Sequence, residues 1–273
     1  MEGLLVKKER LDSILAGMGS LLVAYSGGVD SAFLAVAAHD LLGSRALAVT
    51  ARSPSLASSS LEAAVKLAQE MGFPHRIIDT EEFSDPDYLA NGPTRCYFCK
   101  VELYTKLQTL AEKEGLAWIA NGSNMDDLKD FRPGLKAARE FGVRSPLVEA
   151  ELSKEEIREL SRRRGLPTWD KPAEACLSSR IPYGTPVSLE ALQRISEAEA
   201  FLKSLGLGQV RVRDYGNLAR LEVTPSAIPF LAQEGVRERA VVRLKELGYL
   251  YIALDLEGYR SGSLNAALKK EKG

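Results

Sequence analysis

The chain has 273 residues, of which 45% are hydrophobic and 27% charged, and its 36 basic and 37 acidic residues give a formal net charge of −1. This length supports one large domain, or a large and a small one, and the composition excludes a disordered or low-complexity chain. The near-zero charge excludes a broad nucleic-acid or membrane surface, so any anion site should be local. Residues 1–19 are polar and amphipathic, without the apolar core of a signal peptide, which predicts a cytoplasmic protein.

Short β-rich apolar runs alternate with helical patterns in the first part of the chain. We predict strands at 20–25, 45–50, 75–79 and 116–121, with helices near 31–42, 57–71 and 97–114 between them. This alternation is typical of an α/β fold with a doubly wound parallel sheet. Ligands of such sheets bind beyond the carboxyl ends of the strands, where this chain has the loops SGGVDS, TARSPS and NGSNMDD.

The later part of the chain has a different pattern. Ser153 followed by Glu156 predicts a capping box that opens a helix at about 154–164. Residues 171–186 are rich in Pro and Gly and lack periodicity, which predicts a linker with a chemical role. From residue 187 onward, helical patterns alternate with the strands QVRVR, LARLEV and YLYIALDL. We therefore expect a large α/β domain over 1–170, the linker over 171–186 and a small α+β domain over 187–273.

The segment from Ser26 to Ser31 joins an apolar strand to a helix. Gly27 and Gly28 allow positive φ angles and a close approach of the backbone to an anion, and the two serines add hydroxyl donors. The segment lacks the lysine of a kinase-type P-loop, and Asp30 suits a different task, which is to hold Mg²⁺ on a departing pyrophosphate. An ordinary turn would explain two glycines alone, but six residues in this order at this junction predict a phosphate site.

SGGVDS resembles the PP-loop of the N-type ATP pyrophosphatases, which cleave ATP between its α and β phosphates and transfer AMP to a substrate oxygen. NGSNMDD resembles the Gly-(Ser/Thr)-Asn-x-x-Asp element of the same superfamily. The segments KPAEACLSSRIPYG, VRVRDYGNLARLEV and GYRSGSLN are similar to the LarE family, the ATP-dependent sulfur transferases of nickel-pincer nucleotide synthesis. The resemblance implies the HUP-like fold of the PP-loop enzymes, catalytic roles for Asp30 and Cys176, and an ATP-binding set of Ser26, Gly27, Gly28, Val29, Asp30, Ser31, Thr50 and Gly122.

The resemblance also implies a reaction. ATP would adenylate a carboxylate of pyridinium-3,5-biscarboxylic acid mononucleotide with release of pyrophosphate, which Mg²⁺ neutralises, and sulfur would then displace AMP to give a thiocarboxylate. The implied partners are this mononucleotide, a sulfide or cysteine desulfurase as sulfur source, and further copies of the chain in a hexamer, with no nucleic acid or membrane. The small domain would serve substrate binding and oligomerisation.

The alternation in QVRVR places Arg211 and Arg213 on the strand face opposite the two valines. Parallel guanidinium groups suit a phosphate or a carboxylate. Taken alone, however, the pattern favours a solvated sheet face with salt bridges. The resemblance favours substrate binding by Arg211 and Arg213, together with Arg180, and it implies a divalent cation at Glu222 and Glu199.

The chain has three cysteines, Cys96 and Cys99 in a C-x-x-C and Cys176 in the predicted linker. The pair alone leaves three readings open: a metal or cluster site, a redox dithiol, or two unrelated thiols on one helix. LarE proteins with one donor cysteine convert it to dehydroalanine, whereas those with two additional cysteines resemble this chain. In that variant three thiolates hold a [4Fe-4S] cluster whose fourth iron is open to a sulfide. We expect this cluster, with sacrifice of Cys176 as the alternative.

The cluster also fits the supply of ligands. Iron–sulfur clusters are held by thiolates, whereas a closed zinc site would need a fourth ligand. The only histidines are His39, expected on a helix surface, and His75, at the start of a strand, so neither has an evident zinc role. Arg95 and Lys100 flank the C-x-x-C pair and would favour thiolates.

Three other functions fit parts of the sequence. A PP-loop tRNA thiolase uses the same activation chemistry, but it should have a basic RNA-binding surface, which the net charge of −1 argues against. An ammonia-dependent synthetase needs no donor cysteine. A nucleotide-sensing or zinc-stabilised module would tolerate the loss of Asp30.

Overall fold

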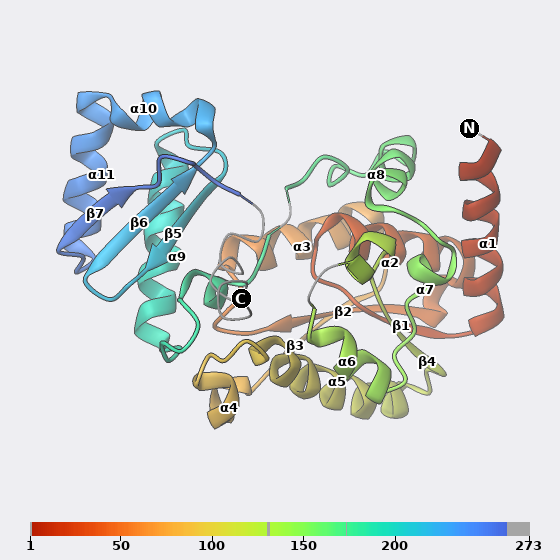
Figure 1. Ribbon diagram of the computed structural model, residues 1–273. Helices are drawn as coiled ribbons and strands as arrows, with labels where there is room; N and C mark the ends of the chain where they lie inside the picture. Colours follow the sequence, from red (N-terminus) through yellow and green to blue (C-terminus); the bar gives the residue numbers. More distant parts are fainter. Residues whose placement is uncertain (1, 130–131, 173, 261–273) are drawn as a thin grey trace. The chain divides into compact units, whose positions relative to one another are not determined.

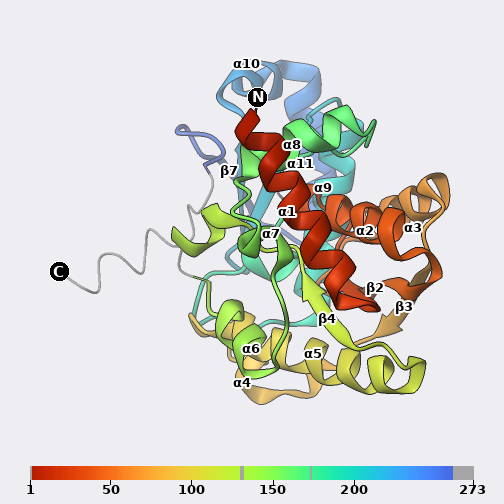
Figure 2. The ribbon, with the colours of Figure 1, turned by 90° about the vertical axis from the view of Figure 1, so that its right-hand side faces the viewer.

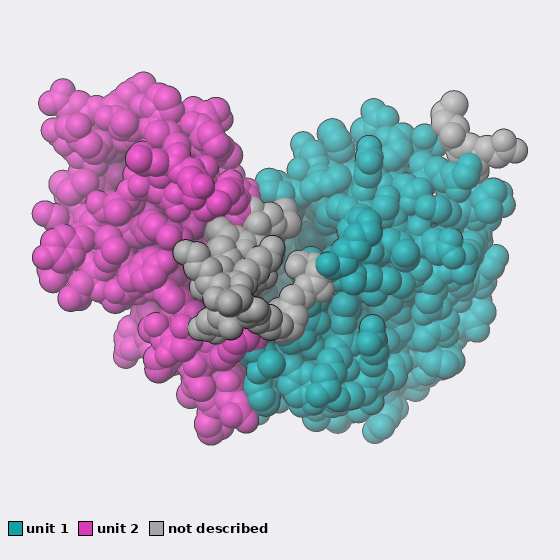
Figure 3. Space-filling model, in the orientation of Figure 1, with its two compact units in different colours: residues 1–85, 94–174 teal, residues 86–93, 175–273 magenta. Residues whose placement is uncertain are grey.

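The computed structural model describes residues 2–129, 132–172 and 174–260. The chain divides into two compact units (Figure 3), the first made of residues 1–85 and 94–174 and the second of residues 86–93 and 175–273. The short segment 86–93 thus belongs to the second unit although it lies inside the predicted first domain. Within the described ranges, no helix is long and apolar enough to span a bilayer.

The first unit contains a parallel sheet of four strands in the order β3-β2-β1-β4. The strands match the predicted positions closely: β1 (Leu21–Ala24), β2 (Ala46–Arg52), β3 (His75–Asp79) and β4 (Trp118–Asn121). Because all four run in the same direction, the loops that follow them meet at one edge of the sheet. The expected α/β class is confirmed.

Helices cover both faces of this sheet (Figures 1 and 2). Leu21 and Val23 of β1 pack on one face with α1 (Glu2–Met18), α2 (Val29–Leu42), α3 (Ser58–Met71) and α8 (Lys154–Arg163). Leu22 faces the opposite layer with α5 (Arg95–Glu114) and α6 (Gly134–Glu140). The period-two alternation of a strand with two buried faces therefore builds a three-layer α/β/α core.

A helix cap, a short helix and several 3₁₀ turns position the loops of the first unit. The predicted capping box at Ser153 is confirmed, because its hydroxyl accepts from the N–H of Glu156 and the Glu156 carboxylate accepts from the N–H of Ser153. This cap fixes the start of α8. The loop regions also contain the short helix α7 (Pro146–Glu149) and the 3₁₀ turns η1 (Gly43–Arg45), η2 (Glu82–Ser84) and η3 (Met125–Lys129).

The second unit contains a three-stranded sheet in the order β5-β6-β7. Strand β5 (Val210–Asp214) runs antiparallel to β6 (Leu218–Val223), and β7 (Tyr251–Leu254) runs parallel to β6. The valine face of β5 packs in one apolar core with α9 (Leu189–Ser204), α10 (Ile228–Ala232) and α11 (Glu234–Glu246). Helix α4 (Pro86–Leu89) also belongs to this unit.

The segment expected as a linker is folded into the second unit from residue 175 onward. Leu177, Arg180 and Ile181 are buried, and residues Leu177–Arg180 form the 3₁₀ turn η4. Asn91 donates to the backbone carbonyl oxygens of Pro182 and Thr185 at 2.9 and 2.8 Å. These residues are therefore a packed part of the second unit.

Candidate active site

The phosphate loop lies at the carboxyl end of β1, directly before α2. Gly27 has a φ of +72°, and a Cβ there would lie 2.8 Å from the Cβ of Ala64, so both backbone and space require glycine. Gly28 has a φ of −81°, so its expected positive φ is wrong. No side chain caps the first turn of α2, and its N–H groups are thus available to an anion.

Hydroxyl groups close the loop on itself. The Ser31 Oγ accepts from the N–H of Ser26 at 3.1 Å and lies 3.0 Å from the Ser26 Oγ. Ser26 is exposed, whereas Ser31 is 5% exposed. The two predicted hydroxyls are thus brought together, with one on the open side of the loop. This arrangement suits a phosphate oxygen that replaces the contact between the serines.

The loop after β4 packs directly on the start of α2. A Cβ on Gly122 would lie 2.8 Å from the backbone nitrogen of Ser31, so the two predicted ATP-binding segments touch through their backbones. The side-chain amide of Asn124 donates to an Asp30 carboxylate oxygen at 3.3 Å, and the backbone N–H of Asn124 donates to the Asp127 carboxylate at 3.1 Å. The Asn-x-x-Asp element therefore orients Asp30.

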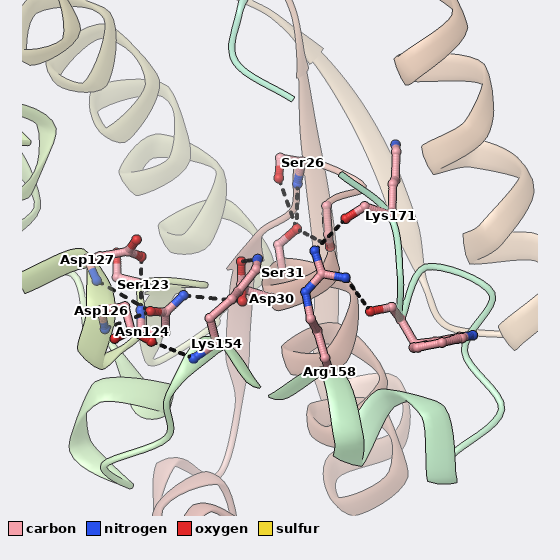
Figure 4. A network of polar contacts seen from close by, with 12 residues as sticks. Ser26, Asp30, Ser31, Ser123, Asn124, Asp126, Asp127, Lys154, Arg158 and Lys171 are labelled. Atoms are coloured by element: carbon pink, nitrogen blue, oxygen red, sulfur yellow. Dashed lines mark hydrogen bonds and ion pairs between the residues drawn. The ribbon is translucent and has the colours of Figure 1, made fainter. Parts of the chain in front are cut away.

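Asp30 also has a cationic partner that the sequence did not predict. The Lys154 Nζ lies 2.5 Å from its Oδ2, and the Lys154 N–H is held by Asp126 at 2.9 Å (Figure 4). Burial raises the pKa of Asp127 above its usual value, and nearby Arg132 opposes the rise. Carboxylates and an ammonium group therefore surround Asp30, which is the setting in which a divalent cation could take the place of the lysine.

Thr50 is 1% exposed and contacts the end of the strand that leads into the phosphate loop. Its hydroxyl donates to the carbonyl oxygen of Tyr25 at 2.9 Å and lies 2.8 Å from the Nε2 of His75. Burial lowers the pKa of His75. Thr50 thus supports the strand end that carries the phosphate loop, while direct contact with ATP stays a prediction.

Two further basic residues lie on the other side of the loop from Asn124 (Figure 4). The Lys171 Nζ is 3.5 Å from the carbonyl oxygen of Gly27 and 3.1 Å from the Glu174 carboxylate. Arg158 of α8 donates to the carbonyl oxygens of Trp169 and Lys171 at 2.8 and 2.9 Å. The sequence analysis missed these residues and Lys154, although the absence of a lysine within the loop was a signal that a cation must come from elsewhere.

The three cysteines predicted to hold sulfur do not all belong to one unit. Cys96 and Cys99 lie on the first turns of α5, where Cys96 is exposed and Cys99 half-buried, and Cys176 of the second unit is exposed at the start of η4. None of the three forms a disulfide. Residues three apart on a helix share one face, so the pair can serve one site. In the described parts of the chain, no three Cys, His, Asp or Glu side chains form a ready metal-binding group.

The arginine face of β5 is buried. Arg211 and Arg213 are 5% and 6% exposed, so a solvated sheet face is wrong. Arg213 donates to the Glu222 carboxylate at 2.7 Å and to the carbonyl oxygen of Ser179 at 2.6 Å. Burial, and then the charge of Arg180, lower the pKa of Arg211. This is a setting in which a bound anion would stabilise the guanidinium groups.

Arg180 makes two kinds of contact. It forms a paired contact with the Glu199 carboxylate at 2.9 and 3.0 Å, and both side chains are buried. It also donates to the carbonyl oxygens of Ala175 and Cys176 at 2.6 and 3.0 Å. Arg180 thus holds the backbone of the predicted donor cysteine, and its role in substrate binding stays a prediction.

Both carboxylates predicted to bind a divalent cation have arginine partners. Glu222 accepts from Arg213 at 2.7 Å and from Arg220 at 2.9 Å, and Glu199 accepts from Arg180 and from the N–H of Val212 at 3.0 Å. A cation would have to displace these donors, so the metal site stays a prediction. The segment GYRSGSLN extends beyond residue 260, and its end lies outside the described residues.

Comparisons with known proteins agree with the geometry of the first unit. The family model described as NAD synthase matches residues 8–86, which contain the phosphate loop. An uncharacterised protein of Synechocystis is 48% identical over 97% of this chain and 98% of its own length. An uncharacterised protein of Methanocaldococcus jannaschii is 30% identical over 88% of this chain and 91% of its own.

A characterised relative is similar along the whole chain. The pyridinium-3,5-bisthiocarboxylic acid mononucleotide synthase of Lactiplantibacillus plantarum is 36% identical over 99% of this chain and 98% of its own length. The similarity therefore includes both the phosphate loop and the second unit. With its PP-loop, Asn-x-x-Asp element and full-length similarity, the chain belongs to the LarE-like family of PP-loop ATP pyrophosphatases and is a homologue of its ATP-dependent sulfurtransferases.

Proposed function

We propose that this protein is an ATP-dependent sulfur transferase that converts a carboxylate of pyridinium-3,5-biscarboxylic acid mononucleotide into a thiocarboxylate. The observation that carries the proposal is the similarity to the mononucleotide synthase over 99% of the chain. The geometry around Asp30 supports the use of ATP independently.

The first step is activation of the carboxylate. A substrate carboxylate oxygen attacks the α-phosphorus of ATP, the bond between that phosphorus and the bridging oxygen breaks, and pyrophosphate leaves. The uncapped N–H groups of α2 and the hydroxyls of Ser26 and Ser31 hold the phosphates. Asp30 would hold Mg²⁺, which neutralises the leaving pyrophosphate when bound. The Asp30 carboxylate offers the oxygen ligands that Mg²⁺ prefers, and Asn124 orients it.

The second unit would bind the mononucleotide. Arg211 and Arg213 are buried on the same face of β5, and burial, followed by the charge of Arg180, lowers the pKa of Arg211. Charge-assisted hydrogen bonds to a phosphate or carboxylate are strong in such surroundings. Because Arg180 holds the backbone of Cys176, the same cluster would align the sulfur donor with the substrate.

The second step is transfer of sulfur. A sulfur nucleophile attacks the acyl carbon of the adenylate, and AMP leaves with the bonding electron pair. Cys96, Cys99 and Cys176 fit a [4Fe-4S] cluster by donor chemistry, since all are thiols outside disulfides and two share one helix face. Such a cluster would supply bound sulfide when present. The hexamer and the external sulfur source remain proposals from family resemblance, and the cytoplasmic location also remains a proposal.

The test of ATP activation is the Asp30→Asn variant. Loss of the metal-holding carboxylate should lower pyrophosphate release on the order of 100-fold or more, measured with ATP, Mg²⁺ and the mononucleotide. Asp40→Asn is the matched control, because Asp40 lies on the same helix and forms only a surface pair with Arg164. Unchanged release by folded Asp30→Asn protein would refute the proposal.

The cysteines require a separate experiment. If they share a cluster, anaerobically reconstituted protein should hold about four irons per chain, each Cys→Ala change should remove them, and supplied sulfide should support repeated turnover. If Cys176 is sacrificed, product should stop at a single turnover, the intact mass should fall by one H₂S, and Cys96→Ala and Cys99→Ala should remain active. That mass loss in active, iron-free protein would overturn the cluster.

A further inference from the structure

The phosphate loop contains no basic residue, although a triphosphate carries several negative charges. The uncapped start of α2 supplies dipoles and N–H groups, but no full positive charge. Lys154 lies on the Asp30 side of the loop, where its ammonium group pairs with Asp30 and its N–H donates to Asp126. A second cation at the loop would complete the electrostatics of the site.

Lys171 is one of the two basic residues on the side of this loop away from Asn124 (Figure 4). Its Nζ lies 3.5 Å from the carbonyl oxygen of Gly27, the residue whose positive φ shapes the loop. Its counter-ion is Glu174 at 3.1 Å, and these side chains are 22% and 36% exposed. A partly exposed ion pair contributes little stability, so a phosphate could replace the carboxylate at low cost.

Arg158 fixes the stretch of chain that carries Lys171. Its guanidinium donates to the carbonyl oxygens of Trp169 and Lys171, bridging α8 to this stretch. Helix α8 is itself anchored, since Ser153 caps it and its buried Ile157 and Leu160 belong to the core shared with α2. Hydrogen bonds from a packed helix therefore hold the backbone of Lys171 next to the phosphate loop.

We propose that Lys171 is the phosphate-binding lysine of this site, which contacts the pyrophosphate part of ATP, and that Arg158 is its positioning residue. The inference rests on the proposed use of ATP. In kinase-type P-loops the lysine that supplies the positive charge lies within the loop, whereas here we assign that role to a lysine outside it.

Binding of nucleotides by calorimetry tests the assignment, with α,β-methylene-ATP and AMP as probes. Lys171→Met should weaken binding of the ATP analogue about 10- to 100-fold, the loss typical of a charge-assisted hydrogen bond, and leave AMP binding unchanged. Lys171→Arg should restore most of the affinity. Lys66→Met is the matched control, because Lys66 is an exposed lysine of α3 that pairs only with Glu70.

Two further variants separate positioning from general structural damage. Arg158→Met should weaken the analogue as well, and the double variant with Lys171→Met should bind no worse than the weaker single variant, because both changes remove one contact. Glu174→Gln should tighten binding by removing the competing carboxylate. Additive losses for the double variant would overturn the role of Arg158.

The outcomes distinguish this inference from the proposed function. If the wild-type protein binds the analogue and Lys171→Met binds it equally well, the lysine assignment is wrong while ATP use stands. A parallel loss of AMP and analogue binding would also overturn it, since Lys171 would then support the fold or the nucleoside. If the wild-type protein binds no analogue, the proposed function itself fails.

Discussion

Replacement of Glu199 by alanine should destabilise the second unit strongly. The change removes the two contacts to Arg180 and the acceptor of the Val212 N–H, and the Arg180 and Glu199 side chains are only 3% and 6% exposed. Breaking a buried pair from one side costs about 3–5 kcal/mol, because the remaining charge is left without its partner. With a urea dependence of about 2 kcal/mol per M, the transition midpoint should fall by about 1.5–2.5 M.

The assay is urea unfolding followed by circular dichroism, with and without a chelator. Glu197→Ala is the matched control, since Glu197 lies on the same helix and its surface pair with Arg243 contributes at most about 1 kcal/mol. A midpoint shift below about 0.5 M for Glu199→Ala would refute the reasoning, since it falls within the surface-pair range. A shift that vanishes with the chelator would instead support the predicted cation at Glu199.

Three other perturbations follow from the geometry. Gly122→Ala would place a Cβ 2.8 Å from the backbone nitrogen of Ser31, so it should cost about 1–3 kcal/mol of stability and weaken ATP binding, whereas Gly17→Ala, with open space around it, should do neither. Arg213→Ala should lower affinity for the mononucleotide about tenfold or more without changing ATP affinity in calorimetry; a joint loss would assign the arginine to the fold. Burial lowers the pKa of His75, so its imidazole binds a proton more readily in the unfolded chain than in the folded one. The free energy of unfolding should therefore decline as pH falls below about 6.5. His75→Gln should reduce that decline in urea midpoints, and an identical decline would contradict it.

The sequence predicted local features of the fold well. The strand at 75–79 and the capping box at Ser153 were found as expected, because alternation and capping depend on neighbouring residues. The period of two also placed the arginines of β5 on one face correctly. It could not predict their burial, because that burial depends on contacts such as that of Arg213 with Ser179, which lies 34 positions away in the sequence.

The candidate site could be predicted only in part, because the sequence shows local motifs but not contacts between distant residues. The phosphate loop and the Asn-x-x-Asp element each form a continuous motif, and the structure joins them through Gly122 and Asn124. Lys154 and Lys171 reach the loop only through the packing of α8 and the chain after it. No spacing in the sequence links Lys171 to Gly27, which lies 144 positions earlier.

Residues 86–93 belong to the second unit, although the residues on both sides of them belong to the first, and this affects the order in which the second unit can fold. Tyr88 and Asn91 bond to residues 90 to 94 positions further along the chain, so a nascent chain presents this segment long before its partners have been synthesised. The intervening residues 94–174 belong to the first unit, which can fold in the meantime. A fragment that begins at residue 175 lacks Asn91, whose side chain holds the carbonyl oxygens of Pro182 and Thr185. The second unit is therefore not a module that can be transplanted by its C-terminal sequence alone, and any graft must carry the early segment with it.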